Sequence, residues 1–396
     1  MKNLWTAEEA SNYSGDLELR VFSSNLLGRS DELVLHGGGN TSVKSMVDGE
    51  EILYVKGSGW DLVSIKAEGF SPVKMSTLLE MAELEELSDT EMVSGQKAAM
   101  IDSSAPNPSV EAILHALIPF KVVDHTHADA VVTISNSVNG KEYIEKLFPN
   151  FLIVPYIMPG FILAHEIFKM TRDFDWDACE GIILHNHGIF TFDDDAKKSY
   201  DKMILAVSMA EDFLSATADL TFDAPKGISV GQIEPTEFDI EKLKELVEKE
   251  KGCEIVLKVN QTPLALHYAS QDHLYMKATR GVLTPEHIIR TKRIPLIVNE
   301  NIEEAVPNYV ADYKGYFEKF ATDEIMLNPA PNYAVVKNFG VLMFGKSEKE
   351  SNVLNDVVEH TMMAVLRADK LGGYESISLK DSFEMEYWEL EQAKLK

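Results

Sequence analysis

Two histidines separated by one residue provide the strongest chemical signal in the sequence. His125 and His127 follow an apolar run that we predict to be a β-strand. Residues i and i+2 of a strand point to the same side, so both imidazoles can face one metal ion. A catalytic zinc site uses about three protein ligands and keeps a further position open. His187 before Gly188, at the end of another predicted strand, is the favoured third ligand, with His185 as a second candidate.

A carboxylate precedes these histidines in the segment Asn107-Pro-Ser-Val-Glu. Asn107 suits a helix N-cap and Pro108 suits the first helical position, so we predict Glu111 in the first turn. A carboxylate near a helix N-terminus and a metal stays ionised, which suits a general base. The alternatives are a simple capping acid and histidines that only hydrogen-bond on a strand. His115 lies one turn further on the same face, and we expect it to support the site.

Two glycine-rich segments lie upstream, at residues 36–44 and 56–60. Glycine-rich turns bring backbone amides close to an anion, and Asn40, Thr41, Ser42 and Ser58 add neutral donors. The two segments together therefore predict a phosphate cradle, whereas either alone would be an ordinary hairpin turn. Neither has the spacing of a dinucleotide-binding fingerprint or a P-loop.

These residues need a scaffold, and the periodicity predicts one that alternates strands with helices. Residues 51–56, 131–135 and 182–184 are rich in β-branched side chains and are predicted strands. Residues 196–217 carry apolar side chains at the spacing of one helix face. The predicted fold class is therefore α/β or α+β.

A composition change at residues 222–238 predicts a linker, because two prolines and two glycines stand among polar residues. A helical pattern then starts at Ile240, and Gly252 ends it. We expect a catalytic domain at 1–225 and a second domain at 239–396.

The two halves resemble each other. Residues 182–214 and 335–366 both run through a strand, an Asn-Xaa-Gly turn and a second strand into a long helix. His187 in the first half corresponds to Phe339 in the second. Unless the similarity is chance, the second half is a copy of the fold that has lost its metal. We expect it to extend the core or an oligomer contact, with a regulatory ligand-binding domain as the alternative.

The composition limits the classes of partner that the protein can bind. The chain has 396 residues and a formal net charge of -27. Such an acidic surface repels nucleic acid and anionic membrane, and an anionic substrate must be attracted locally. Cys179 and Cys253 form no disulfide framework, and no apolar run is long enough to span a bilayer. We therefore expect a soluble cytoplasmic protein.

In order along the chain, these motifs resemble the class II aldolase/adducin family. The motifs are Gly39-Asn-Thr-Ser-Val-Lys, Gly57-Ser-Gly, Pro108-Ser-Val-Glu, His125-Thr-His and His187-Gly. The resemblance is closer to the aldolase portion of bifunctional rhamnulose-1-phosphate aldolase/alcohol dehydrogenase proteins. Residues 283–292 and 386–395 in the second half belong to the same pattern.

The resemblance implies an αβα sandwich with a central, mainly antiparallel sheet, and a homo-oligomer such as a tetramer. It implies Zn²⁺, or another divalent metal, held by three histidines with Glu111 near or on it. It implies a ketose 1-phosphate of the rhamnulose 1-phosphate type, cleaved to dihydroxyacetone phosphate and an aldehyde such as lactaldehyde. The implied metal ligands are His125, His127 and His187, and the implied phosphate-binding residues are Asn40, Ser58, Gly59 and Ser109.

Two departures from the family pattern matter. Val110 stands where simpler phosphate-binding members often have a serine, and the sequence stops at Lys396, where bifunctional relatives begin a dehydrogenase domain. We therefore expect no NAD site. Within the family, an epimerase, a dehydratase or a decarboxylase of a sugar or sugar-acid phosphate would use the same metal site. A non-catalytic, adducin-like assembly protein is a rival that the intact histidines and Glu111 disfavour.

Overall fold

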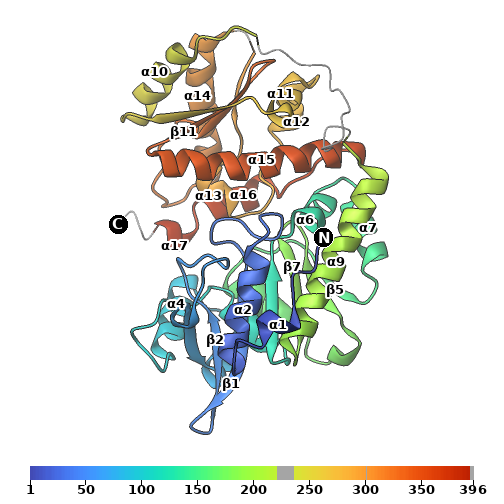
Figure 1. Cartoon of the computed structure of the whole chain (residues 1–396). Coiled ribbons are helices and arrows are strands. Elements are labelled where there is room, and N and C mark those ends of the chain that lie inside the picture. Colours follow the sequence, from blue (N-terminus) through green and yellow to red (C-terminus); the bar gives the residue numbers. More distant parts are fainter. Residues whose placement is uncertain (221–235, 300, 393–396) are drawn as a thin grey trace. The chain divides into compact units, whose positions relative to one another are not determined.

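The structure is a computed structural model that describes residues 1–220, 236–299 and 301–392. The chain divides into two compact units (Figure 1). Unit 1 comprises Met1–Ser135 and Lys141–Asp212, and unit 2 comprises Asn136–Gly140 and Phe213–Lys396. Most of the predicted linker at 222–238 lies outside the described residues. We keep 1–225 and 239–396 as the proposed domain limits.

Unit 1 is built on a seven-stranded sheet with the order β3-β2-β1-β4-β7-β6-β5. Every neighbouring pair is antiparallel except β5 and β6, which are parallel. This confirms the central, mainly antiparallel sheet. The strands are β1 (Asn40–Val47), β2 (Glu50–Lys56), β3 (Phe70–Lys74), β4 (Val122–Thr126), β5 (Phe151–Val154), β6 (Gly181–Leu184) and β7 (Gly188–Asp193).

Helices cover both faces of this sheet, which gives the expected αβα sandwich. Val123 of β4 packs with side chains of α5 and α8, whereas its neighbour Val122 packs with side chains of α2 and α9. Successive strand residues point to opposite faces, so these contacts define the two layers. The helices are α1 (Ala7–Ala10), α2 (Asp16–Gly28), α3 (Met75–Ala82), α4 (Asp89–Ala98), α5 (Ala112–Leu117), α6 (Asp129–Ser135), α7 (Gly140–Leu147), α8 (Phe161–Met170) and α9 (Ala196–Thr217), with 3-10 turns at Ala67–Gly69 and Trp176–Ala178.

Two local predictions in unit 1 are wrong. Residues 131–135, predicted as a strand, belong to helix α6 and are all buried. A short β-branched run that is buried on every side gives no periodicity that separates a strand from a helix. The helix predicted from Asn107 begins only at Ala112, with Glu111 at its N-cap. Pro108 instead pairs with Gly57, and Val110 and Glu111 form a turn that leads into the helix.

Unit 2 contains a four-stranded sheet with the order β8-β11-β10-β9. Its pairing directions reproduce those of β4-β7-β6-β5 in unit 1, including the parallel last pair. Asn186 and Asn338, in the matching turns, both have φ of 58°. The internal repeat is therefore present in the fold. The strands are β8 (Val256–Asn260), β9 (Leu296–Val298), β10 (Tyr333–Val336) and β11 (Gly340–Gly345).

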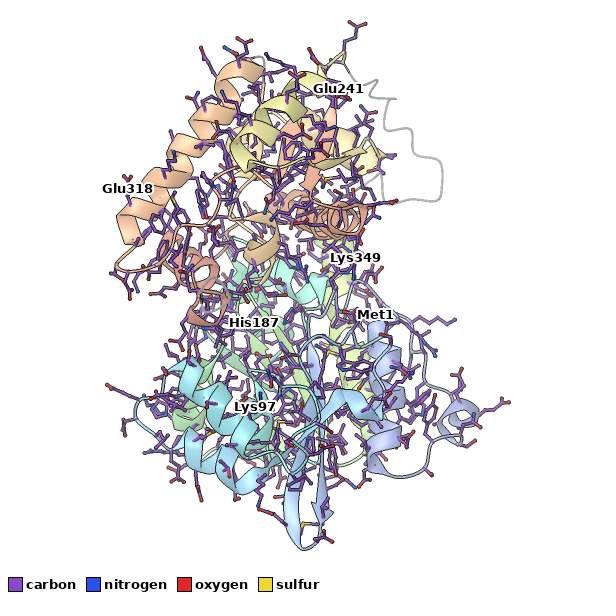
Figure 2. The ribbon with its side chains drawn as sticks, turned by 90° about the vertical axis from the view of Figure 1, so that its left-hand side faces the viewer. Met1, Lys97, His187, Glu241, Glu318 and Lys349 are labelled. Atoms are coloured by element: carbon purple, nitrogen blue, oxygen red, sulfur yellow. The ribbon has the colours of Figure 1, made fainter. Side chains whose placement is uncertain are left out.

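The helices of unit 2 follow the sequence pattern closely. The predicted helix from Ile240 ends at Lys251, and Gly252 adopts the left-handed conformation at φ of 72°. Glu241 and Glu318 are exposed on the helices of this unit (Figure 2). Within the described ranges, no helix combines the length and apolarity needed to cross a membrane. The helices are α10 (Ile240–Lys251), α11 (Pro263–Ser270), α12 (Leu274–Ala278), α13 (His287–Thr291), α14 (Ile302–Phe320), α15 (Glu348–Lys370), α16 (Leu379–Glu386) and α17 (Glu389–Gln392).

Candidate active site

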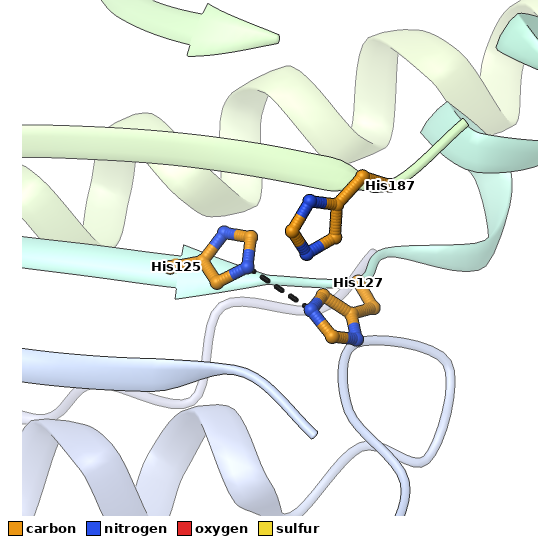
Figure 3. A group of neighbouring side chains, drawn as sticks. All are labelled: His125, His127 and His187. Carbon is orange, nitrogen blue, oxygen red and sulfur yellow. Dashed lines mark hydrogen bonds between the residues drawn. The ribbon is translucent and has the colours of Figure 1, made fainter. Parts of the chain in front are cut away.

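Three histidines converge where β4 ends and β7 begins (Figure 3). His125 lies within β4, His127 follows the last residue of that strand, and His187 precedes the first residue of β7. One ring nitrogen from each lies within 4.8 Å of the others. The two strands are paired antiparallel, so the end of one meets the start of the next. The alternative ligand His185 is not part of this group.

The chemistry of this group fits a divalent metal ion. The Nδ1–H of His125 donates to the Ile189 carbonyl at 3.1 Å, so in the neutral ring Nε2 is the unprotonated nitrogen that can bind a metal. That Nε2 lies 3.0 Å from Nε2 of His127. Glu111 Oε1 is buried 3.7 Å from Nε2 of His187 and makes no hydrogen bond in the part of the chain that the structure describes. Imidazole nitrogens and a carboxylate oxygen form a common Zn²⁺ ligand set.

Gly188 is required by a close approach of two strands and not by the turn itself. A Cβ atom at this position would lie 2.4 Å from the Thr126 carbonyl oxygen and 2.9 Å from Cε1 of His125. The positive φ of the turn belongs instead to Asn186. Glycine is therefore needed because β7 approaches the histidine strand closely, and Asn186 redirects the chain.

A buried chain of hydrogen bonds holds Glu111 beside the histidines. Asn40 Nδ2 donates to Glu111 Oε2 at 2.6 Å, and that oxygen lies 3.5 Å from Nε2 of His125. His115 Nε2–H donates to Asn40 Oδ1, and the Ser42 hydroxyl donates to His115 Nδ1 at 2.7 Å. Burial holds the pKa of His115 well below its usual range, so its ring is neutral and can donate and accept at once. This series of hydrogen bonds fixes the orientation of the Asn40 amide, with Nδ2 toward Glu111.

Ser42, which the sequence indicates as a neutral donor to an anion, donates to His115 in the structure. It lies two residues after Asn40 on β1, so both side chains are on the same face of the strand. This spacing was the available signal. Its partner was not predictable, because the hydrogen bond to His115 joins residues 73 positions apart.

The predicted phosphate-binding residues lie in loops that pair with each other. The Ser58 amide donates to the Asn107 carbonyl at 2.8 Å, and the Ser109 amide donates to the Lys56 carbonyl at 3.0 Å. Asn40 Nδ2 also reaches the Ser109 hydroxyl, at 3.1 Å. The structure therefore brings Ser58 and Ser109 to the same edge of the site as Asn40.

Lys56 joins the two glycine-rich segments. Its Nζ donates to the Gly37 carbonyl at 2.9 Å, and burial lowers the pKa of Lys56 to about 8. Gly59, which follows in the same loop, has φ of 86°, a conformation that favours glycine. These loops place the Lys56 cation where it interacts electrostatically with the carboxylate of Glu111.

A buried ion pair supports β4 from its other face. Arg20 Nη2 of α2 lies 2.5 Å from Asp124 Oδ1, and the Ser199 hydroxyl of α9 donates to Asp124 Oδ2 at 2.5 Å. Arg20 and Asp124 are both fully buried. The sequence interpretation did not select these residues, although a charged residue inside an apolar strand was a usable signal. The pair links the histidine strand to helices α2 and α9.

Two family models match the chain and together cover most of it. Residues 23–214 match the class II aldolase and adducin N-terminal domain. Residues 237–395 match the family described as aldolase class II, second domain.

Comparison with individual proteins gives a consistent result. The N-terminal class II aldolase domain of a conserved Thermoplasma acidophilum protein is 39% identical, with a TM-score of 0.50, over 54% of this chain and 99% of that one. An uncharacterized oxidoreductase of Bacillus subtilis, YuxG, is 30% identical over 100% of this chain, which spans 60% of the length of YuxG. An L-fuculose 1-phosphate aldolase is 13% identical, with a TM-score of 0.37, over 56% of this chain and 94% of that one. The last similarity is too low to carry a substrate over to this chain.

Proposed function

This chain belongs to the class II aldolase and adducin family, and we propose that it cleaves a ketose 1-phosphate of the rhamnulose 1-phosphate type. The products would be dihydroxyacetone phosphate and an aldehyde such as lactaldehyde. The enzyme class, a carbon–carbon lyase of the class II aldolase type, follows from the family. The substrate, Zn²⁺ as the metal, a homo-oligomeric state and a cytoplasmic location are proposals that rest on the resemblance.

One observation carries the proposal. The three converging imidazoles and the carboxylate of Glu111 share one buried site, and Glu111 is oriented by Asn40 rather than by a salt bridge to a lysine or arginine. A capping acid at the surface would be solvated, whereas Glu111 is 6% exposed. A buried carboxylate beside three histidines is suited to metal-assisted proton transfer.

His125, His127 and His187 would hold the metal, which would supply a Lewis acid that polarises the substrate carbonyl. Glu111 would remove the proton from carbon 3 of dihydroxyacetone phosphate when the bond forms, and return it when the bond is cleaved. Asn40 would hold the carboxylate in position for this step through its 2.6 Å hydrogen bond. Exclusion of water strengthens these electrostatic interactions.

The phosphate would lie against the paired loops. Ser58 and Ser109 offer hydroxyls, Gly59 offers a backbone amide, and buried Lys56 offers a positive charge nearby. A local cradle of this kind is needed because the chain as a whole carries a net charge of -27. We assign no nicotinamide chemistry to this site, and the oxidoreductase name of YuxG describes that protein.

The test is aldol cleavage of L-rhamnulose 1-phosphate, with L-fuculose 1-phosphate beside it. Released dihydroxyacetone phosphate is measured before chelation, after chelation and after Zn²⁺ is added back. Activity that is lost with the chelator and restored by Zn²⁺ is the expected result. If folded, zinc-loaded protein cleaves neither sugar phosphate, the substrate proposal is wrong. Phosphorylated sugar acids would then be assayed for epimerisation, dehydration and decarboxylation.

A further inference from the structure

Unit 2 has a cavity of about 290 Å³ between the segment leading into β9 and helix α14. Its walls are mostly apolar, with aliphatic side chains on the β9 side and tyrosines on the α14 side. The tyrosines recur at helical spacing, so they form one face of α14. The residues that carry the argument are Arg293, Ile294, Leu296, Tyr309, Tyr313 and Tyr316.

Arg293 is the cation that lines this cavity, and Asp312 of the same lining and buried Glu386 act on its charge without forming an ion pair with it. Its guanidinium lies 5.3 Å from the ring centroid of Tyr316, a cation–π distance, and the side chain is half-buried. Among the described residues it makes no hydrogen bond and no ion pair within 4.0 Å. A half-buried guanidinium usually pairs with a carboxylate or a phosphate, so its donors are available to a ligand.

Lys292 and Glu386 are two opposite charges that contact Tyr313 and neutralise each other. Lys292 Nζ is 3.7 Å from the centroid of the Tyr313 ring and 4.0 Å from Glu386 Oε1, and it donates to the Asn328 carbonyl at 2.6 Å. The Tyr313 hydroxyl donates to Glu386 Oε1 at 2.8 Å. Lys292 and Glu386 come from the two second-half segments that follow the family pattern, 283–292 and 386–395, and the aldolase reaction uses neither.

This pair bears signs of a functional site rather than a simple core contact. Lys292 has a φ of 62°, which costs free energy in a residue other than glycine. Burial lowers the pKa of Lys292 to about 8, and burial raises the pKa of Glu386. Strained and perturbed residues beside an apolar cavity are typical of ligand sites.

The charges select the class of ligand. Arg293 can pair with both oxygens of one carboxylate through its planar fork. Asp312, an exposed residue that also lines the cavity, disfavours a second negative charge on the ligand. We propose that this cavity binds a small monocarboxylate with an apolar body, the carboxylate on Arg293 and the body against Tyr309, Tyr313 and Tyr316. The site is independent of the proposed aldolase reaction.

The experiment uses the full chain and four probes of similar size: phenylacetate, hexanoate, phenyl phosphate and benzylamine. Binding is measured by saturation-transfer difference NMR and by titration. Arg293→Gln removes the cation, and Arg280→Gln is the matched control, because Arg280 is an exposed arginine of the same unit outside the cavity. Asn308→Trp places a large side chain at an exposed position on the wall of the cavity. Circular dichroism checks that each variant is folded.

The expected result is that a carboxylate binds, and that its affinity falls about 10- to 100-fold in Arg293→Gln, the loss of a charge-assisted hydrogen-bonded pair. Asn308→Trp should abolish binding, and Arg280→Gln should not change it. The proposal is overturned if neither carboxylate binds, or if binding survives in both cavity variants. It is also overturned if phenyl phosphate or benzylamine binds more tightly than the carboxylates. Should Arg293→Gln fail to fold, Asn308→Trp decides the question.

Discussion

The two halves of the molecule use the same strand arrangement, and among the residues that the structure describes the histidine group occurs in unit 1 alone. In unit 1, His125 of β4 is paired with Phe190, two residues after Gly188. In unit 2, Val259 of β8 is paired with Leu342, two residues after Gly340. The register therefore places Val259 where unit 1 has His125.

The other two histidines are replaced as well. Two residues after Val259 comes Gln261, the counterpart of His127, and Phe339 is the counterpart of His187. Phe339 is 7% exposed and its ring lies 5.1 Å from that of Phe238. Gln261 Nε2 donates to the Phe339 carbonyl at 2.9 Å, so this side chain bonds to the turn. In unit 2, the packed ring of Phe339 and the hydrogen bond of Gln261 occupy two of the three ligand positions, and Val259 at the third is 38% exposed.

The strand framework forms both with and without the metal-binding histidines. Both versions form the same pairings, one with a polar group that fits a metal and one with an apolar core. A few side chains at the strand ends thus determine whether this fold carries a metal-binding group. Exchanging those side chains is the direct test.

The largest effect is expected from His187→Phe, which gives unit 1 the residue of unit 2. Loss of one of three nitrogen ligands should remove most of the bound metal, and activity should fall by at least about 10³-fold because the Lewis acid is lost. Metal content is measured by mass spectrometry of the purified protein beside the cleavage assay. Phe339→Leu is the matched control and should retain metal and activity. Full metal occupancy in His187→Phe would show that this histidine is not a ligand.

The second-largest loss of activity is expected from Glu111→Gln. It keeps the shape of the side chain and removes the basic oxygen, so kcat should fall by about 10²- to 10⁴-fold with metal content unchanged. Glu91→Gln, in the exposed capping box of α4, is the control and should leave kcat unaltered. If Glu111→Gln keeps its kcat, the proton is transferred by another group.

Phe339→Ala tests the apolar half. The lost side chain leaves a cavity in the core of unit 2, and the free energy of unfolding should decrease by about 3–5 kcal/mol. Urea unfolding followed by fluorescence and circular dichroism measures this change. Leu379→Ala, at a position 44% exposed, should change it by less than about 0.5 kcal/mol. Equal effects of the two substitutions would contradict a structural role for Phe339.

The smallest effect is expected from Ser42→Ala, which removes the first donor of the chain that reaches Glu111. One hydrogen bond contributes about 1 kcal/mol, so kcat should fall about fivefold while KM and metal content stay constant. Ser45→Ala, on the same strand but bonded to Asp16 at the surface, serves as the control. A fall in metal content without a change in kcat would place the role of Ser42 elsewhere.

The sequence by itself predicted the parts whose signals are local. The structure contains the features whose sequence signals depend on neighbouring residues. These are the histidine spacing, the glycine-rich turns, helix α9 and the end of α10 at Gly252. The order of the motifs indicated the family. The repeat was also visible, since Asn186 and Asn338 precede the same turns.

Only the tertiary structure decided the features that depend on distant partners. Burial on every side decided that residues 131–135 form a helix and not a strand. The pairing of Pro108 with Gly57 decided where α5 begins. Arg20 meets Asp124, and Ser42 meets His115, across long sequence separations. Each of these contacts satisfies a polar group that the fold has buried. Local periodicity carries no information about such partners, because they become neighbours only when the sheet has formed.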